Sequence, residues 1–277
     1  MNEPRIAELL AQARAAGVDR LDAQLLLGRL LGQSRTWLLA HDDTMLDATQ
    51  HAAWNSQLAR RAAGEPLAYL LGEKEFRGLL LQVDPNVLVP RPETEVLVEW
   101  ALELLDGPLR ERSPPRVVDL GTGSGAIAIA VKHECPAAQV SATDASAAAL
   151  DMAIANARRL GLNISFAAGS WWDAVDDAAF DLVLSNPPYV AGADPHLAAL
   201  RHEPLAALTP GGDGLGALRD IIGGASGHLA PGGWLLVEHG YDQADAVQAL
   251  FGAHGFSAIA TRSDLAGQPR CTGGRHR

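Results

Sequence analysis

The sequence contains little cysteine and lacks common metal-binding patterns. Only Cys135 and Cys271 occur among the 277 residues, far apart and without a Cys-x-x-Cys pair. This usage predicts neither a disulfide framework nor a zinc module, and it fits a reducing cytoplasm. The nine histidines include no His-Glu-x-x-His motif of the kind that zinc enzymes use. We therefore expect a cytoplasmic protein that holds no metal.

The chain also lacks an excess of positive charge and any long apolar run. The chain carries 22 Lys and Arg against 33 Asp and Glu, a formal net charge of -11. That balance disfavours non-specific attraction to nucleic acid or anionic lipid. No apolar run approaches the length of a membrane span, and the segment MNEPRIAELLAQ lacks the basic start of a targeting peptide. We expect no direct nucleic-acid partner and no membrane association, and the 48% hydrophobic content is ample for a folded core.

The first part of the chain has the pattern of a small helical domain. Apolar residues recur at three- and four-residue spacing in PRIAELLAQARAAG and DRLDAQLLLGRLLG. A third short helix is predicted in SRTWLLAH, with Ser34 as its N-cap, and a fourth from Asp47 to Ala63. Residues 1–75 therefore predict a helical bundle.

The pattern changes after this bundle. Between Phe76 and Val89 two apolar runs flank Asp84-Pro85-Asn86, which predicts a β-hairpin linker over residues 76–90. Residues 91–277 then alternate apolar strands and helices, which is typical of a parallel sheet covered on both faces. The predicted strands are RVVDL, QVSATD, ISFAAG, FDLVLS and WLLVEHG, with GFSAIAT and QPRCTGGR as a closing pair.

A glycine loop lies between the first of these strands and the following helix. In VVDLGTGSGAIAIA, Gly121, Gly123 and Gly125 allow close approach of a ligand to backbone N–H groups at a helix N-terminus. The loop alone leaves two alternatives open. It also fits a dinucleotide fingerprint, with Asp144 on a ribose hydroxyl, and it fits a tight turn without a ligand.

The acid Asp119 favours S-adenosyl-L-methionine over NAD. A pyrophosphate would be repelled by this carboxylate, whereas the ammonium group of a methionine moiety is attracted to it, directly or through water. The pattern Asp-x-Gly-x-Gly-x-Gly, with Asp144 at the end of the next strand, resembles the Rossmann-like class I methyltransferases. The same Asp144 is alternatively a helix cap or turn residue. The predicted cofactor residues of these two segments are Asp119, Gly121, Thr122, Gly123, Ser124, Gly125 and Asp144.

A second motif, Asn186-Pro187-Pro188-Tyr189, ends the strand FDLVLS. Proline cannot continue a central strand, so the segment leaves the sheet at its carboxyl end, where α/β proteins bind ligands. With the glycine loop, the motif resembles enzymes that methylate a planar amide or exocyclic amine nitrogen. The Asn186 side-chain oxygen and the Pro187 carbonyl can each accept one N–H of a substrate NH₂, while Tyr189 packs on the planar group. We predict direct in-line methyl transfer, with these four residues binding the substrate and Asn186 also facing the cofactor.

Five segments together resemble the PrmC/HemK family of protein-(glutamine-N5) methyltransferases. They are GEPLAYLLGEKEFRGLLLQVDPNVLVPRPETEVLVE, VVDLGTGSGAIAIA, SNPPYV, HEPLAAL and GGWLLVEHG. The resemblance implies S-adenosyl-L-methionine as cofactor, S-adenosyl-L-homocysteine as product, and the glutamine of Gly-Gly-Gln in class 1 peptide chain release factors as substrate. It also implies that the helical domain docks the release factor and that Trp171 contacts the adenine, with Trp172 as the alternative.

Several alternatives stay open. A nucleic-acid adenine-N6 methyltransferase shares the Asn-Pro-Pro-Tyr motif, although it predicts a basic module where this chain has DDTMLDATQ. An NAD-dependent oxidoreductase leaves Asp119 unexplained, and a binding module would retain cofactor without turnover. The stretch PRPETE either shapes the wall of the active site or only starts a helix capped by Thr94. Residues 191–214 are a candidate lid.

Overall fold

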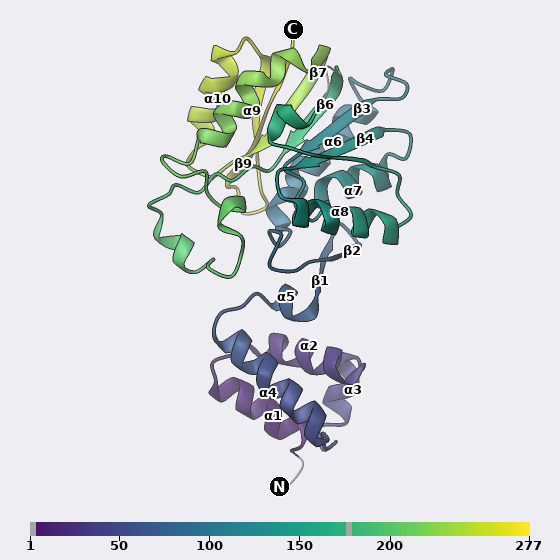
Figure 1. Cartoon of the computed structure of the whole chain (residues 1–277), viewed down its shortest axis with the longest axis vertical. Helices are drawn as coiled ribbons and strands as arrows, with labels where there is room; N and C mark the ends of the chain where they lie inside the picture. Colours follow the sequence, from purple (N-terminus) through teal and green to yellow (C-terminus); the bar gives the residue numbers. More distant parts are fainter. Residues whose placement is uncertain (1–3, 176–178) are drawn as a thin grey trace. The chain divides into compact units, whose positions relative to one another are not determined.

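The chain folds into two compact units, residues 1–73 and 74–277 (Figure 1). The computed structural model describes residues 4–175 and 179–277. Within the described ranges no helix combines the length and apolar character needed to cross a bilayer.

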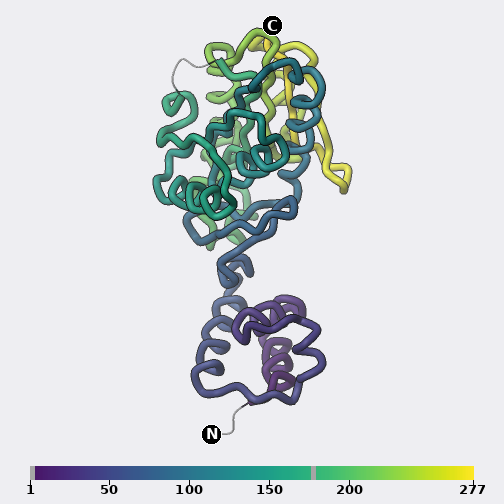
Figure 2. The backbone as a smooth tube through the Cα atoms, turned by 90° about the vertical axis from the view of Figure 1, so that its right-hand side faces the viewer, coloured from purple at the N-terminus to yellow at the C-terminus, as the bar shows by residue number. Residues whose placement is uncertain are grey.

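The first unit is the predicted helical bundle (Figure 2). It has one more helix than expected. Its interior packs Leu26, Leu27 and Trp54, each no more than 1% exposed. Ser34 caps the third helix as predicted, because its hydroxyl accepts a hydrogen bond from the backbone N–H of Trp37 at 3.1 Å. The helices are α1 (Ile6–Ala15), α2 (Arg20–Leu31), α3 (Arg35–Ala40), α4 (Ala48–Ala62) and the unpredicted α5 (Leu67–Leu71).

The predicted hairpin is present, but its turn lies elsewhere. The strands β1 (Glu73–Phe76) and β2 (Leu79–Gln82) form a two-stranded sheet and reverse at Arg77-Gly78. These two residues have φ of +49° and +76°, the left-handed pair that a two-residue hairpin turn requires. The prediction of the reversal at Asp84-Pro85-Asn86 is wrong, because that tripeptide forms a separate turn after β2.

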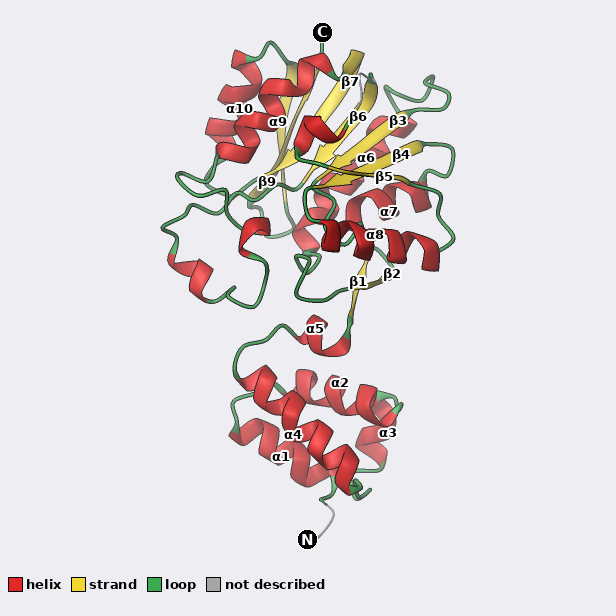
Figure 3. Cartoon of the chain, in the orientation of Figure 1, coloured by secondary structure: helices red, strands yellow, loops and turns green. Residues whose placement is uncertain are grey.

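The second unit is a mixed seven-stranded sheet between two layers of helices (Figure 3). The strand order is β5-β4-β3-β6-β7-β9-β8, with β3 to β7 parallel and β9 antiparallel to both neighbours. The Rossmann-like prediction is therefore confirmed. The strands are β3 (Arg116–Leu120), β4 (Gln139–Asp144), β5 (Ser165–Ala168), β6 (Phe180–Ser185), β7 (Leu229–Glu238), β8 (Ser257–Ser263) and β9 (Pro269–Arg275).

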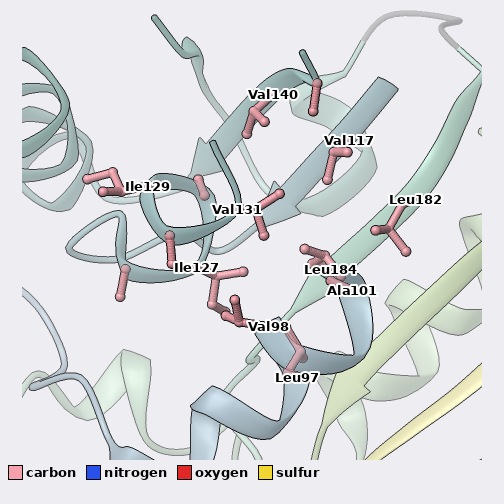
Figure 4. Close-up of a cluster of buried hydrophobic side chains, with 14 of the residues drawn as sticks. Leu97, Val98, Ala101, Val117, Ile127, Ile129, Val131, Val140, Leu182 and Leu184 are labelled. Atoms are coloured by element: carbon pink, nitrogen blue, oxygen red, sulfur yellow. The ribbon is translucent and has the colours of Figure 1, made fainter. Parts of the chain in front are cut away.

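Successive residues along a strand are buried on opposite faces of the sheet. Val117 packs with α6 (Glu95–Asp106) and α7 (Ala126–Glu134), whereas its neighbour Val118 packs with α9 (Gly216–Gly224) and α10 (Ala244–Ala253). α8 (Ala147–Arg159) joins the first layer through Ala157. Figure 4 shows the first layer, with labelled side chains Leu97, Val98, Ala101, Val117, Ile127, Ile129, Val131, Val140, Leu182 and Leu184.

Two glycines explain how the last strand fits between these layers. A Cβ on Gly273 would lie 2.3 Å from Leu236 Cδ2, and one on Gly274 would lie 2.7 Å from Phe251 Cδ1. No larger residue fits without movement of these neighbours. β9 can therefore pair with β7 while both helical layers close over it.

Candidate functional site

A cavity of about 270 Å³ in the second unit gathers most of the predicted site residues. It lies at the carboxyl ends of β3, β4 and β6, where the strand order reverses between β3 and its neighbour β6. Ligands bind at such a reversal in open α/β sheets. The predicted residues on its wall are Gly121, Thr122, Gly123, Ser124, Asp144, Trp171, Asn186 and Pro188.

The glycine loop forms one wall because its backbone is left-handed at each glycine. Gly121, Gly123 and Gly125 have φ of +72°, +56° and +85°, values that other residues adopt only with strain. The backbone N–H groups of Gly121 and Thr122 both donate to the carbonyl of Thr143, which fixes the loop to β4. A Cβ on Gly125 would lie 2.8 Å from Ile129 Cδ1, so this glycine permits close helix packing rather than lining the cavity.

Asp119 lies beneath the loop and not on the cavity wall. Its side chain is fully buried, and Oδ2 accepts hydrogen bonds from the Thr122 hydroxyl at 2.6 Å and the Ala128 N–H at 3.3 Å. Oδ1 has no hydrogen-bond partner among the residues that the structure describes. Burial raises the pKa of this carboxyl to about 7 despite those two donors. Its predicted contact with a methionine ammonium group stays a prediction.

Asp144 ends β4 with its carboxylate at the cavity. Oδ2 accepts from the Gly123 N–H and Oδ1 from the Ser146 N–H, both at 2.8 Å. The cap of α8 is Ser146, whose hydroxyl accepts from Ala149 N–H. Asp144 is thus a turn residue that also tethers the glycine loop, and each of its oxygens retains a lone pair for a further donor.

The two tryptophans have different surroundings. Trp171 lines the cavity against Gly121, where a Cβ would lie 3.0 Å from its Cζ3 atom. Its φ of +45° is unusual for a bulky residue and tends to occur where function constrains the backbone. Trp172 is half-buried against α9, donating to the Ile221 carbonyl at 3.1 Å and stacking on His228. The cavity geometry favours Trp171 over Trp172 as a ligand contact.

The Asn-Pro-Pro-Tyr segment meets the glycine loop because β6 pairs with β3. Ser185 pairs with Leu120, so Asn186 and Gly121 leave adjacent strands at the same level. Asn186 and Pro188 line the cavity, whereas Pro187 and Tyr189 are not on its wall. The amide nitrogen of Asn186 donates to the Thr94 hydroxyl at 3.1 Å. Among the described residues nothing donates to its Oδ1, which leaves this oxygen as an acceptor at the cavity.

Tyr189 is held by partners on the far side of the motif. Its hydroxyl donates to Glu238 Oε1 at 3.1 Å, and its carbonyl accepts from Gln243 Nε2 at 2.9 Å. Burial, followed by the Glu238 charge, raises the pKa of the tyrosine above its ordinary value. Burial also raises the pKa of Glu238 to about 7. The hydrogen bonds of its hydroxyl and its carbonyl together fix the direction of the Tyr189 ring.

Sequence reasoning gave Thr94 no role beyond capping a helix within PRPETE, and it assigned no role to Glu238. Thr94 occupies the cap position of α6 but makes no capping hydrogen bond, so the structure does not support the alternative in which PRPETE only starts a helix capped by the Thr94 side chain. It is 4% exposed, and its hydroxyl accepts from Asn186 Nδ2 instead. The available signal was Glu238 itself, a single acid at the end of the apolar strand WLLVE.

The segment after the motif is attached to the cavity wall by Glu203. This buried carboxylate accepts from the Val89 N–H at 3.1 Å and from the Arg91 guanidinium. Pro204, within the candidate lid, also lines the cavity. Among the described residues no cluster of three or more histidines, cysteines and acids is suited to a metal. Glu203 thus joins the candidate lid to the PRPETE segment.

Comparisons with known proteins agree over nearly the whole chain. A family profile described as "Methyltransferase small domain" matches residues 98–260, and one described as "PrmC N-terminal domain" matches residues 5–72. The release factor glutamine methyltransferase of Bordetella pertussis is 52% identical over 93% of this chain and 95% of that protein. The protein of the same description from Burkholderia pseudomallei is 50% identical over 97% and 95%.

Solved structures share the fold at low identity. The hMettl16 catalytic domain in complex with MAT2A 3′UTR hairpin 6 has a TM-score of 0.58 at 16% identity, covering 79% of this chain and 81% of that one. The Thermus thermophilus 16S rRNA N2 G1207 methyltransferase has a TM-score of 0.55 at 19% identity, covering 74% and 50%. These similarities support the methyltransferase fold alone.

Proposed function

Because the chain belongs to the release factor glutamine methyltransferase family, we propose that its cavity brings S-adenosyl-L-methionine and a glutamine side chain together. The chain is an S-adenosylmethionine-dependent methyltransferase. The observation that carries the proposal for the site is the position of Asn186, beside the glycine loop with Oδ1 free at the cavity.

The residues on the cavity wall fit this cofactor chemically. Gly121 and Gly123 present backbone without side chains, so the methionine part can approach closely. Asp144 offers an anionic acceptor for ribose hydroxyls, and Trp171 offers a flat ring for the adenine. When bound, S-adenosyl-L-methionine supplies an electrophilic methyl group on a positively charged sulfur and leaves as S-adenosyl-L-homocysteine.

The protein must compensate for the weak nucleophilicity of an amide nitrogen, whose lone pair is delocalised into the carbonyl. Asn186 Oδ1 accepts one N–H of the glutamine NH₂ at the cavity, and the carbonyl of Pro187, which lies between the wall residues Asn186 and Pro188, accepts the other; together they hold the nitrogen in line with the methyl group. Positive charge grows on nitrogen as the N–C bond forms and the S–C bond breaks. The two acceptors therefore stabilise the transition state more than the ground state. The nitrogen then loses one proton to solvent, and no strong base is required.

The substrate is the glutamine of Gly-Gly-Gln in class 1 peptide chain release factors, methylated at N5. The helical unit, residues 1–73 in the structure, docks this protein substrate. The formal charge of -11 opposes direct binding to nucleic acid or anionic membrane. Since translation termination occurs in the cytoplasm, the enzyme acts there.

The test offers the purified protein labelled S-adenosylmethionine with an unmethylated release factor or with unmethylated DNA. A release factor carrying Gly-Gly-Ala in place of Gly-Gly-Gln is the matched control. Mass spectrometry should locate one methyl group on the glutamine amide and none on the control. Methyl on adenine would instead support a nucleic-acid adenine-N6 methyltransferase, and cofactor binding without transfer to any substrate would support a binding module.

A further inference from the structure

Three segments far apart in the sequence meet behind Asn186 in one buried polar group. Thr94 comes from PRPETE, Asn186 and Tyr189 from the motif after β6, and Glu238 from the end of β7. Asn186 Nδ2 donates to the Thr94 hydroxyl and Tyr189 donates to Glu238 Oε1, each at 3.1 Å. Thr94 also lies near Glu238, since its hydroxyl opposes the rise in the pKa of that carboxyl, although the two share no hydrogen bond of standard geometry.

The number of protons available in this group determines which partner donates in each hydrogen bond. Glu238 is 1% exposed, and its Oε2 has no hydrogen bond of standard geometry among the described residues, so the nearby Thr94 hydroxyl is a donor that an ionised Glu238 can recruit. A threonine hydroxyl has only one proton, and Thr94 Oγ1 can then only accept from Asn186. While Glu238 is ionised, the Asn186 nitrogen therefore faces Thr94, as the structure shows, and its oxygen faces the cavity.

The opposite orientation of the Asn186 amide would abolish the proposed catalysis. Its NH₂ group would face the NH₂ group of the substrate, so that two donors met without an acceptor. We propose that Thr94 and Glu238 are positioning residues that hold the Asn186 amide with its oxygen toward the substrate nitrogen. This inference rests on the proposed role of Asn186 and adds the residues that set its orientation.

Protonation of Glu238 reverses this order. A protonated Glu238 can donate to Thr94, which then donates to Asn186 Oδ1 and turns the amide around. The charged or titratable groups that face Glu238 are Glu93 beside Thr94, Tyr189 from the motif, and Arg270 and Cys271 from β9. Turnover at saturating substrates should therefore fall as pH drops through about 7, the pKa of Glu238.

The experiment compares Thr94→Val with Thr94→Ser. Valine keeps the shape but removes the hydroxyl, so kcat should fall roughly 10-fold, the effect of one lost hydrogen bond, while the cofactor Kd stays within about threefold. Serine keeps the hydroxyl and should restore most of the lost turnover. Thr272→Val is the matched control, because this buried threonine bonds to His239 Nε2 and is not on the cavity wall. It should lower the melting temperature without the loss of kcat.

Glu238→Gln gives a second test, which can be carried out even if the Thr94→Val variant folds poorly. Glutamine is neutral at every pH, so the fall of kcat below about pH 7 should flatten. An unchanged pH profile, or equal kcat for the serine and valine variants, overturns the positioning role. Asn186→Ala separates the two proposals: full turnover in that variant refutes the proposed function, whereas a loss there without any effect at Thr94 refutes only this inference.

Discussion

Replacing Asp144 tests whether its carboxylate binds the cofactor or only shapes a turn. The structure gives this side chain two internal donors, Gly123 N–H and Ser146 N–H, each at 2.8 Å. Asp144→Ala removes both of these bonds and the acceptor proposed for the ribose. Since the lost bond to the ribose has a charged partner, its contribution is about 1.5–3 kcal/mol. At 1.4 kcal/mol for each factor of ten, the Kd for S-adenosylmethionine should rise about 10- to 150-fold.

Asp144→Asn separates the turn from the charge. Its side-chain oxygen can still accept from the Ser146 N–H, which preserves the turn, but its NH₂ group then faces the Gly123 N–H. We expect the Kd of this variant for S-adenosylmethionine to lie between the values for wild type and Asp144→Ala. Calorimetry with S-adenosylmethionine measures both, and kcat at saturating cofactor should change much less than Kd.

Ser146→Ala is the structural control in the same turn. It removes the hydroxyl that caps α8, which should lower the free energy of unfolding by about 0.5–2 kcal/mol while the Asp144 carboxylate stays in place. If Asp144→Ala binds cofactor as tightly as wild type, Asp144 is only a turn residue. An equal loss of affinity in Ser146→Ala would show that the turn, and not the carboxylate, sets the affinity.

Three further outcomes are expected. Asn186→Ala should lower kcat about 10²-fold or more with cofactor Kd nearly unchanged, since only an acceptor for the transition state is lost; unchanged turnover refutes that role. Asp119 has a folded pKa of about 7, above its unfolded value, so its burial costs stability progressively as pH rises towards and through 7. Asp119→Asn should therefore reduce the fall in melting temperature from pH 5 to pH 8, and an identical fall contradicts the assignment. Gly273→Ala would place a Cβ 2.3 Å from Leu236 Cδ2 and should cost about 1–3 kcal/mol of unfolding free energy. Gly227→Ala, where a Cβ meets open space, should be nearly neutral, and equal costs for the two glycines would refute the packing argument.

Local features of the sequence were enough for the fold class. The helical periodicity of the first unit and the alternation of strands and helices in the second are properties of short windows. The glycine loop and the Asn-Pro-Pro-Tyr motif also predicted one shared crevice, because both follow parallel strands at their carboxyl ends. The hairpin turn was misplaced to Asp84-Pro85-Asn86 because Pro-Asn is a strong turn signal in a sequence. The Arg77-Gly78 pair is a weaker signal, because an arginine rarely adopts the positive φ that it has here.

The sequence by itself therefore determined the fold class and the placement of the glycine loop and Asn186 at one cavity, while their roles toward cofactor and substrate stay predictions. Only the tertiary structure decided which tryptophan lies at the cavity, how Glu203 holds the segment after the motif, and what stands behind Asn186. Asn186 and Thr94 are 92 positions apart, and a hydrogen bond over that separation leaves no periodic trace in the chain. Its partners are fixed by the pairing of β3 with β6 and by the packing of α6, which brings together polar groups that burial then obliges to bond.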